Sequence, residues 1–254
     1  MFSHLQRSIR GLAALALASC LLLGLSACGS SEKTVATVGK TKLSQATLNH
    51  WMTTTLGGDY HAALGAVAPD GLVSDPANYP RCASVMARIA PKGAGKPALN
   101  ESQLELRCRQ LNAAIKEQAL GYVLSVLWAV EEGSELHSPV SEAEVTRRMR
   151  ELAYRDYHNP AQFVKTLAGL RRSLADERFL IKRNIFEDRY LARINAQAAK
   201  LGGGQSAKVK LVLQNNAKWM AKTDCSPGYL AWECKQYGSS KGASPSAAEV
   251  LEGL

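Results

Sequence analysis

Cysteine is the residue type whose positions in this chain point most directly to chemistry. The 254-residue sequence contains six cysteines, which are Cys20, Cys28, Cys82, Cys108, Cys225 and Cys234. A cysteine can form a disulfide, bind a metal ion, act as a nucleophile or carry a lipid. The residues around each cysteine and the spacing between cysteines distinguish these uses.

The first 27 residues are typical of a secretory signal peptide. Arg7 and Arg10 give a basic start, and residues 11–27 carry no charge. A basic region followed by an apolar one is the pattern of a signal that takes no part in the mature fold. The alternative is a membrane-spanning anchor, for which about 17 apolar residues would be marginal.

Cys28 lies where the apolar start of the chain becomes polar. The sequence LSAC at 25–28 resembles the bacterial lipobox, in which a signal peptidase cuts before an acylated cysteine. LASC at 17–20 fits the same short pattern, but three leucines follow Cys20, whereas polar GSSEK follows Cys28. We therefore expect residues 1–27 to be a lipoprotein signal peptide and Cys28 to be lipidated. Residues 28–34 would then tether the protein to the extracytoplasmic face of the cell membrane.

The remaining four cysteines predict two disulfides. An extracytoplasmic compartment is oxidising, and four thiols allow three pairings. The gaps between them match neither a redox C-x-x-C motif nor zinc-binding pairs. We expect the nearest-neighbour pairing, Cys82 with Cys108 and Cys225 with Cys234.

The charge balance of the chain is basic. Removal of the signal leaves 29 basic against 22 acidic residues, a net formal charge of +7. This charge would attract acidic clients or anionic surfaces. Nucleic acid is not an expected partner, because a secreted chain rarely meets it and no reader motif is present.

The sequence shows no catalytic motif. H-E-x-x-H and a strand-linked G-x-G-x-x-G are absent, and G-x-S-x-G is matched only by GSSKG at 238–242, in the small and polar C-terminal segment. KGAGKP at 92–97 looks like a phosphate-binding loop, but it lacks the first glycine and the Ser or Thr that would hold Mg²⁺. The histidines have no metal-ligand spacing. We expect no metal, no cofactor and no enzymatic activity.

Hydrophobic periodicity predicts a mainly α protein with a short N-terminal β-hairpin. Strands are expected at 35–38 and 41–43, and a helix should begin after Ser44 and end at Gly57-Gly58. Residues 59–98 are rich in Gly, Pro and Ala and predict an irregular insertion, which a Cys82–Cys108 bridge would pin to the next helix.

Further helices are expected toward the C-terminus. Capping residues predict helix starts at Asn100, Ser141, Asn159 and Ser173. The segment 119–130 is apolar almost all round and too short to cross a bilayer, so it should be buried by other helices. A last helix should contain Trp219, and residues 238–254 should be a disordered tail.

Several motifs resemble those of SurA and PrsA-type extracytoplasmic foldases. VATVGKTKLSQATLNHWM resembles their N-terminal strand pair and first helix. More specifically, the chain is similar to actinobacterial lipoprotein foldases. These contain a D-P-x-N-Y-x-x-C-type loop, matched at 75–82, and a W-x-A-K-T-x-C segment, matched at 219–225. The match covers most of residues 35–237, and it implies a helical SurA N-terminal-like domain there.

One part of those foldases has no counterpart in this chain. Their parvulin-type prolyl isomerase domain usually lies between the long helix and the C-terminal segment, where this chain has only LGGGQS at 201–206. The resemblance therefore implies a chaperone without the catalytic domain, and no catalytic residue is carried over.

The leading functional hypothesis is a membrane-tethered, non-catalytic chaperone that binds unfolded or nascent secreted proteins in an apolar groove. Aromatic residues could line this groove; the candidates are Trp51, Trp128, Phe179, Phe186 and Tyr190. The alternative for each of them is ordinary core packing. Two other functions are weighed: a scaffold lipoprotein that binds one envelope partner, and residual prolyl isomerase activity inherited from the family.

Overall fold

The described part of the chain contains, at its N-terminal end, the strand pair that the sequence predicts. The computed structural model describes residues 32–89 and 99–237, and its elements belong to one compact unit, Lys33–Leu254. Strands β1 (Thr34–Val38) and β2 (Thr41–Ser44) pair antiparallel. The turn between them contains Gly39 at a φ of 56°, a left-handed conformation that glycine adopts without steric cost.

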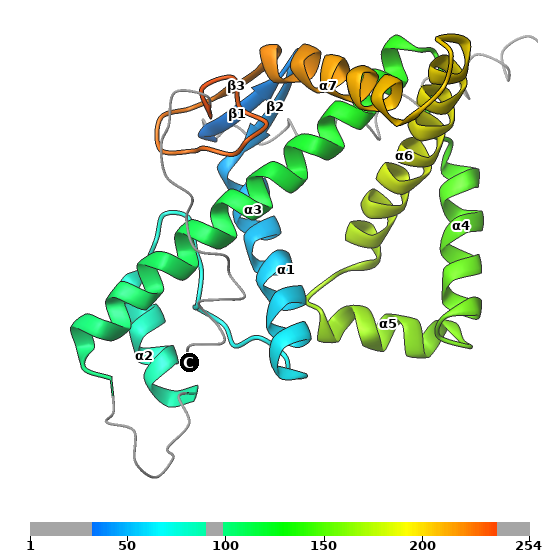
Figure 1. The fold of residues 1–254 in the computed structure, drawn as a ribbon. Coiled ribbons are helices and arrows are strands. Elements are labelled where there is room, and N and C mark those ends of the chain that lie inside the picture. Colours follow the sequence, from blue (N-terminus) through cyan, green and yellow to red (C-terminus); the bar gives the residue numbers. More distant parts are fainter. Residues whose placement is uncertain (1–31, 90–98, 238–254) are drawn as a thin grey trace, which may run out of the picture. The chain divides into compact units, whose positions relative to one another are not determined.

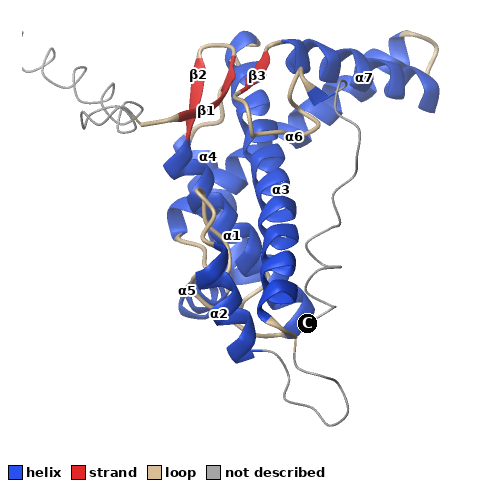
Figure 2. Cartoon of the chain, turned by 90° about the vertical axis from the view of Figure 1, so that its left-hand side faces the viewer, coloured by secondary structure: helices blue, strands red, loops and turns tan. Residues whose placement is uncertain are grey.

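A third strand completes the sheet. Strand β3 (Thr223–Cys225) pairs antiparallel with the free edge of β1, so the strand order is β2-β1-β3 (Figure 2). Strand β3 is not predicted by the sequence pattern. Its three residues are too few for an alternation pattern to be recognised, and its pairing partner lies almost 200 residues earlier in the chain.

Seven helices make up most of the described residues. They are α1 (Gln45–Leu64), α2 (Tyr79–Ile89), α3 (Glu101–Glu135), α4 (Glu142–Arg155), α5 (Pro160–Gly169), α6 (Leu174–Lys200) and α7 (Gln205–Ala221) (Figure 1). Every predicted helix start is confirmed by a side chain that accepts a hydrogen bond from the first turn. These N-caps are Ser44, Asn100, Ser141, Asn159 and Ser173.

The predicted end of α1 at Gly57-Gly58 is wrong. The helix continues to Leu64 and ends at Gly65, which has a φ of 63°. Gly57 serves packing rather than termination, because a Cβ atom there would lie 2.5 Å from the main-chain oxygen of Leu170. In the sequence, a glycine that lets another segment approach a helix closely looks the same as a glycine that ends the helix.

The predicted irregular insertion at 59–98 also needs correction. Its start belongs to α1, and 79–89 form helix α2. The predicted Cys82–Cys108 disulfide is present and joins α2 to α3, and the predicted Cys225–Cys234 disulfide is present as well. Cys82 and Cys108 lie in the main hydrophobic core, so the bridge stabilises a packed helix.

Asp75 ties the segment between α1 and α2 to two distant parts of the chain. Its Oδ2 atom accepts hydrogen bonds from Gln45 Nε2 at 2.8 Å and from the Tyr229 hydroxyl at 2.7 Å. Burial alone would raise the pKa of this carboxyl, but these hydrogen bonds and the charges of Lys116 and Lys33 hold it below its ordinary value. Asp75 is therefore a buried, ionised anchor.

Helix α3 is the centre of the main core. It packs against α1, α2, α6 and β1, and the segment 119–130 is largely buried, as predicted. Two smaller hydrophobic clusters lie elsewhere: one joins α4 to α6 through Val145, Ile181 and Ile185, and the other joins α4 to α5 through Ala153, Phe163 and Leu167.

Four predictions lie outside the described residues: the signal peptide at 1–27, Cys28 with most of the tether, the KGAGKP loop at 92–97, and the tail at 238–254. Within the described ranges, none of the helices combines the length and the apolar character that a membrane span requires.

Glu233 is a buried carboxyl in the loop that the Cys225–Cys234 disulfide closes. Only 3% of its surface is exposed, and its Oε2 atom has no hydrogen-bond partner. The carboxyl packs against Gly121 of α3, where a Cβ atom would lie 2.7 Å from Oε2. Burial, together with the nearby charge of Glu117, raises the pKa of Glu233 to about 7.

We predict that Glu233→Gln changes the pH dependence of stability. The folded protein favours protonated Glu233, so the stability of the natural chain should fall as the pH rises from about 4.5 to about 7. Full ionisation should cost roughly 3 kcal/mol. Chemical unfolding between pH 5 and 8 should show this loss, and Glu233→Gln should remove it.

Glu101→Gln is the control, because Glu101 is exposed on the same helix that Glu233 packs against. This variant should keep the pH dependence of the natural chain. Identical pH profiles for the natural chain and Glu233→Gln would contradict the account.

Candidate functional site

A buried carboxylate joins the three helices that surround the candidate site. Glu132 of α3 is only 7% exposed. Its Oε1 atom accepts from Arg193 of α6 at 3.1 Å, and its Oε2 atom accepts from Lys218 and Trp219 of α7 at 3.0 and 2.6 Å. Because a buried charge is tolerated only when it is paired and hydrogen-bonded, these contacts fix the helices around Glu132.

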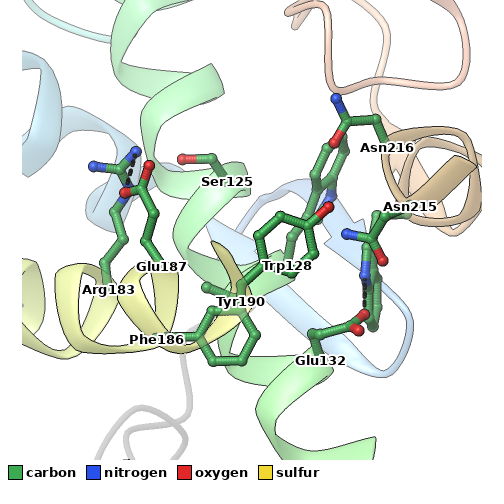
Figure 3. Close-up of a pocket in the computed structure, with 11 residues that line it drawn as sticks. Ser125, Trp128, Glu132, Arg183, Phe186, Glu187, Tyr190, Asn215 and Asn216 are labelled. Carbon is green, nitrogen blue, oxygen red and sulfur yellow. Dashed lines mark hydrogen bonds and ion pairs between the residues drawn. The ribbon is translucent and has the colours of Figure 1, made fainter. Parts of the chain in front are cut away.

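A cavity of ≈ 170 Å³ lies where these helices meet. Figure 3 shows side chains from α3, α6 and α7 around it. Its lining combines aromatic, amide and charged groups: Ser125, Trp128, Ala129, Glu132, Arg183, Phe186, Glu187, Tyr190, Asn215, Asn216 and Trp219. A concave site with aromatic walls and a few polar groups is the usual form of a binding pocket.

Two tryptophans hold one wall of the cavity through a shared threonine. Trp128 Nε1 donates to Thr223 Oγ1 at 2.7 Å, and Thr223 Oγ1 donates to the main-chain oxygen of Trp219 at 2.8 Å. Trp232 packs edge-on against Trp128, with ring centroids 5.5 Å apart. The wall is therefore fixed by β3 and by the disulfide-closed loop that follows it.

Helix α6 forms the opposite wall through Phe186 and Tyr190. Gly133 of α3 gives the Phe186 ring space, because a Cβ atom there would lie 3.2 Å from the ring. The Tyr190 hydroxyl is buried and lies beside the side-chain amide of Asn215. Burial and the negative charge of Glu132 raise the pKa of this hydroxyl, so it is neutral at physiological pH.

The charged groups that line the cavity are paired. Arg183 and Glu187 form an ion pair at 3.4 Å across one turn of α6, and Glu132 is paired with Arg193 and Lys218. The cavity therefore presents no unpaired charge to a ligand. It presents aromatic surface and the neutral amides of Asn215 and Asn216.

The structure divides the five predicted groove aromatics into two groups. Trp128, Phe186 and Tyr190 line the cavity. Trp51 and Phe179 pack against each other, with ring centroids 5.1 Å apart, and belong to the main core or its border. For Trp51, which is 6% exposed, core packing is therefore the correct interpretation.

Sequence reasoning missed four important residues of the site: Glu132, Asn215, Asn216 and Trp219. Glu132 adjoins Glu131 on a helix, and such adjacent acidic residues are typical of solvated surface charge. Its cationic partners lie about 60 and 86 residues further along the chain, and no local pattern reports such a pairing. A weak signal was Gly133, which marks a close helix approach beside Glu132.

The pair of His50 and Asp176 has a structural role at the start of α6. His50 Nε2 lies 2.7 Å from Asp176 Oδ1, and the other oxygen of Asp176 accepts from the main chain and hydroxyl of Ser173 at the start of α6. Asp176 thus completes a helix cap. Over 32–89 and 99–237, no group of three or more His, Cys, Asp or Glu residues is placed to hold a metal ion.

Comparison with models of protein families, with curated proteins and with solved structures finds no match for this chain.

We predict that Glu132→Ala destabilises the protein by about 2 kcal/mol. The substitution leaves Trp219 Nε1 without its acceptor and Arg193 and Lys218 without a counter-charge. The two cations keep partial access to water, which limits the loss. The free energy of unfolding, obtained by urea denaturation, measures the effect.

Glu135→Ala is the matched control. Glu135 also pairs with Lys218, at 2.6 Å, but it lies on the surface, where salt bridges contribute little. Its removal should leave stability almost unchanged. Equal effects of the two substitutions would contradict a special role for the buried carboxylate.

Proposed function

We propose that this protein is a membrane-tethered extracytoplasmic chaperone that holds unfolded secreted proteins without catalysing a reaction. The observation that carries the proposal is the aromatic cavity between α3, α6 and α7. A holding site needs accessible apolar surface inside a stable frame, and the Glu132 contacts supply that frame around Trp128, Phe186 and Tyr190.

Apolar surface continues from the cavity along α7. Val209, Leu213 and Asn216 are spaced four and three residues apart, so they lie on one face of the helix. Asn216 lines the cavity, and Leu213 is 61% exposed. Exposed apolar residues beside an apolar pocket are typical of surfaces that bind other polypeptides. This face would extend the contact with an unfolded segment beyond the cavity.

The two disulfides support an extracytoplasmic location. Both Cys82–Cys108 and Cys225–Cys234 join segments of the packed core, and such structural bridges persist in oxidising compartments. This agrees with the lipobox-like sequence at 25–28. The resemblance to SurA and PrsA-type foldases adds the expectation that clients are secreted proteins during folding.

We predict that purified Lys33–Leu254 delays the aggregation of several unrelated unfolded proteins. The chaperone binds apolar segments rather than one sequence, so light scattering from three reduced or heat-unfolded test proteins should fall in each case. Leu213→Gln removes exposed apolar surface beside the cavity and should weaken the effect. Val164→Gln, an exposed apolar position on α5, is the matched control and should keep it.

Protection of only one test protein would favour a scaffold that binds one envelope partner, and protection of none would contradict the chaperone. If Leu213→Gln and Val164→Gln lost protection against aggregation equally, the protection would not depend on the exposed apolar face of α7.

We predict that Cys28 is the lipidated residue. Mass spectrometry of membrane-extracted protein should show an N-terminal Cys28 with two acyl chains, and Cys28→Ala should release or misprocess the protein. A lipid that persists in the variant would show that Cys20 is the anchor. The Cys20→Ala variant, which leaves LSAC at 25–28 intact, is the control and should remain lipidated.

A further inference from the structure

We propose that the cavity binds one uncharged apolar side chain of an unfolded polypeptide, no larger than that of phenylalanine. The side-chain amides of Asn215 and Asn216 would hydrogen-bond the main chain next to it. This inference rests on the proposed function, and it specifies which part of a client the cavity takes and which parts it rejects.

The size of the cavity sets the upper limit. Its ≈ 170 Å³ compares with about 150 Å³ for an engineered apolar cavity that binds benzene. A leucine or phenylalanine side chain therefore fits, whereas the two fused rings of tryptophan exceed the space. Alanine would leave most of the cavity empty and would lose the contacts that favour binding.

The charges around the cavity exclude ionised side chains. Arg183 is paired with Glu187 at 3.4 Å, and Glu132 is paired with Arg193 at 3.1 Å and Lys218 at 3.0 Å. An entering Lys or Asp would lose hydration without finding a free opposite charge, which is unfavourable. A neutral side chain meets no such cost.

The walls of the cavity favour an apolar guest. Trp128 of α3 and Phe186 and Tyr190 of α6 line the cavity with aromatic rings, and Trp219 of α7, which is only 1% exposed, completes the lining. Burying an apolar side chain against these rings releases water from both surfaces, and aromatic guests also gain edge or offset contacts.

The amides of α7 suit the main chain of an extended peptide. Asn215 and Asn216 both line the cavity, and Figure 3 shows their side chains on the α7 side of it. Each side-chain amide offers one carbonyl acceptor and two N–H donors, which match the N–H and C=O groups of a peptide bond. Because every peptide bond carries these groups, such recognition is independent of the client sequence.

The test uses N-acetyl amino-acid methylamides as minimal probes of one residue with its flanking peptide bonds. The protein is Lys33–Leu254, the compact unit that contains every described helix and strand after Glu32. The indole N–H signals of Trp128 and Trp219 report the cavity by NMR, and Trp51 in the core serves as an internal reference.

The phenylalanine and leucine probes should shift the Trp128 and Trp219 signals saturably and leave Trp51 unchanged. Their affinity should exceed that of the glycine probe by at least about tenfold. The aspartate, lysine and tryptophan probes should bind no better than glycine. Equal binding of all probes, or shifts at Trp51 alone, would overturn the proposal.

Two sets of variants test whether the probes bind in the cavity and contact the amides of α7. Ala129→Leu places a side chain in the cavity and should lower the phenylalanine-probe affinity at least about tenfold, whereas Ala113→Leu on the exposed face of α3 should not. If Ala129→Leu fails to fold, the exposed helix α7 provides the second set. Asn215→Ala/Asn216→Ala should lower the affinity about fivefold, whereas Gln214→Ala should not.

The result can separate this inference from the proposed function. Loss of probe binding in Ala129→Leu with full protection against aggregation would leave the chaperone standing and overturn the cavity as its client site. If the natural chain bound the probes but protected none of the test proteins, the cavity would stand as a site for apolar side chains and the chaperone function would be contradicted.

Other occupants of the cavity would also contradict the inference. If residues 238–254 filled it, the Trp128 and Trp219 signals would change when the chain is cut after Tyr237. If a second copy filled it, the signals would change with protein concentration. The inference predicts neither change in the absence of a probe.

Discussion

The buried carboxylate of Glu132 fixes the relation between the three helices on which the interpretation of this protein depends. It belongs to α3, and its partners belong to α6 and α7. A carboxylate this deeply buried is stable only when cations and N–H groups surround it, so its pairing restricts how α6 and α7 can lie against α3. The cavity is the space that remains beside these contacts.

Both disulfides act at some distance from the cavity but support its frame. Cys82–Cys108 holds α2 against the N-terminal half of α3, opposite to the end that carries Glu132. Cys225–Cys234 closes the loop that places Trp232 against Trp128. The frame is thus covalently constrained at two places, while the exposed apolar side chains of α7 remain available for contacts with other molecules.

The sequence was informative where structure is determined locally. Helix starts follow from hydrogen bonds between a cap and residues three positions later, and Asn100 and Ser173 carry complete capping boxes. The hairpin follows from two short apolar runs around Gly39. The disulfide pairing followed because neighbouring cysteines in sequence are also neighbours in the fold.

The sequence was uninformative where distant segments meet. Strand β3 exists only because it pairs with β1, and Gly57 lies inside α1 because the backbone near Leu170 approaches it closely. The same limit applies to the site. Aromatic residues could be recognised as candidates, but the hydrophobic pattern of the sequence does not distinguish Trp51, which lies in the core, from Trp128, which lines the cavity. Burial of Glu132 depends on cations supplied by two later helices.

We propose that unfolded polypeptides contact the protein at the cavity between α3, α6 and α7. Site-specific photocrosslinking tests it most directly, with a photoreactive phenylalanine derivative placed at Asn216, which lines the cavity, or at Gln214 on the same helix. With a reduced, unfolded test protein, the account predicts strong crosslinks from position 216, weak ones from 214, and none from either to the same protein in its folded form. Equal crosslinking from both positions, or crosslinking to the folded form, would contradict it.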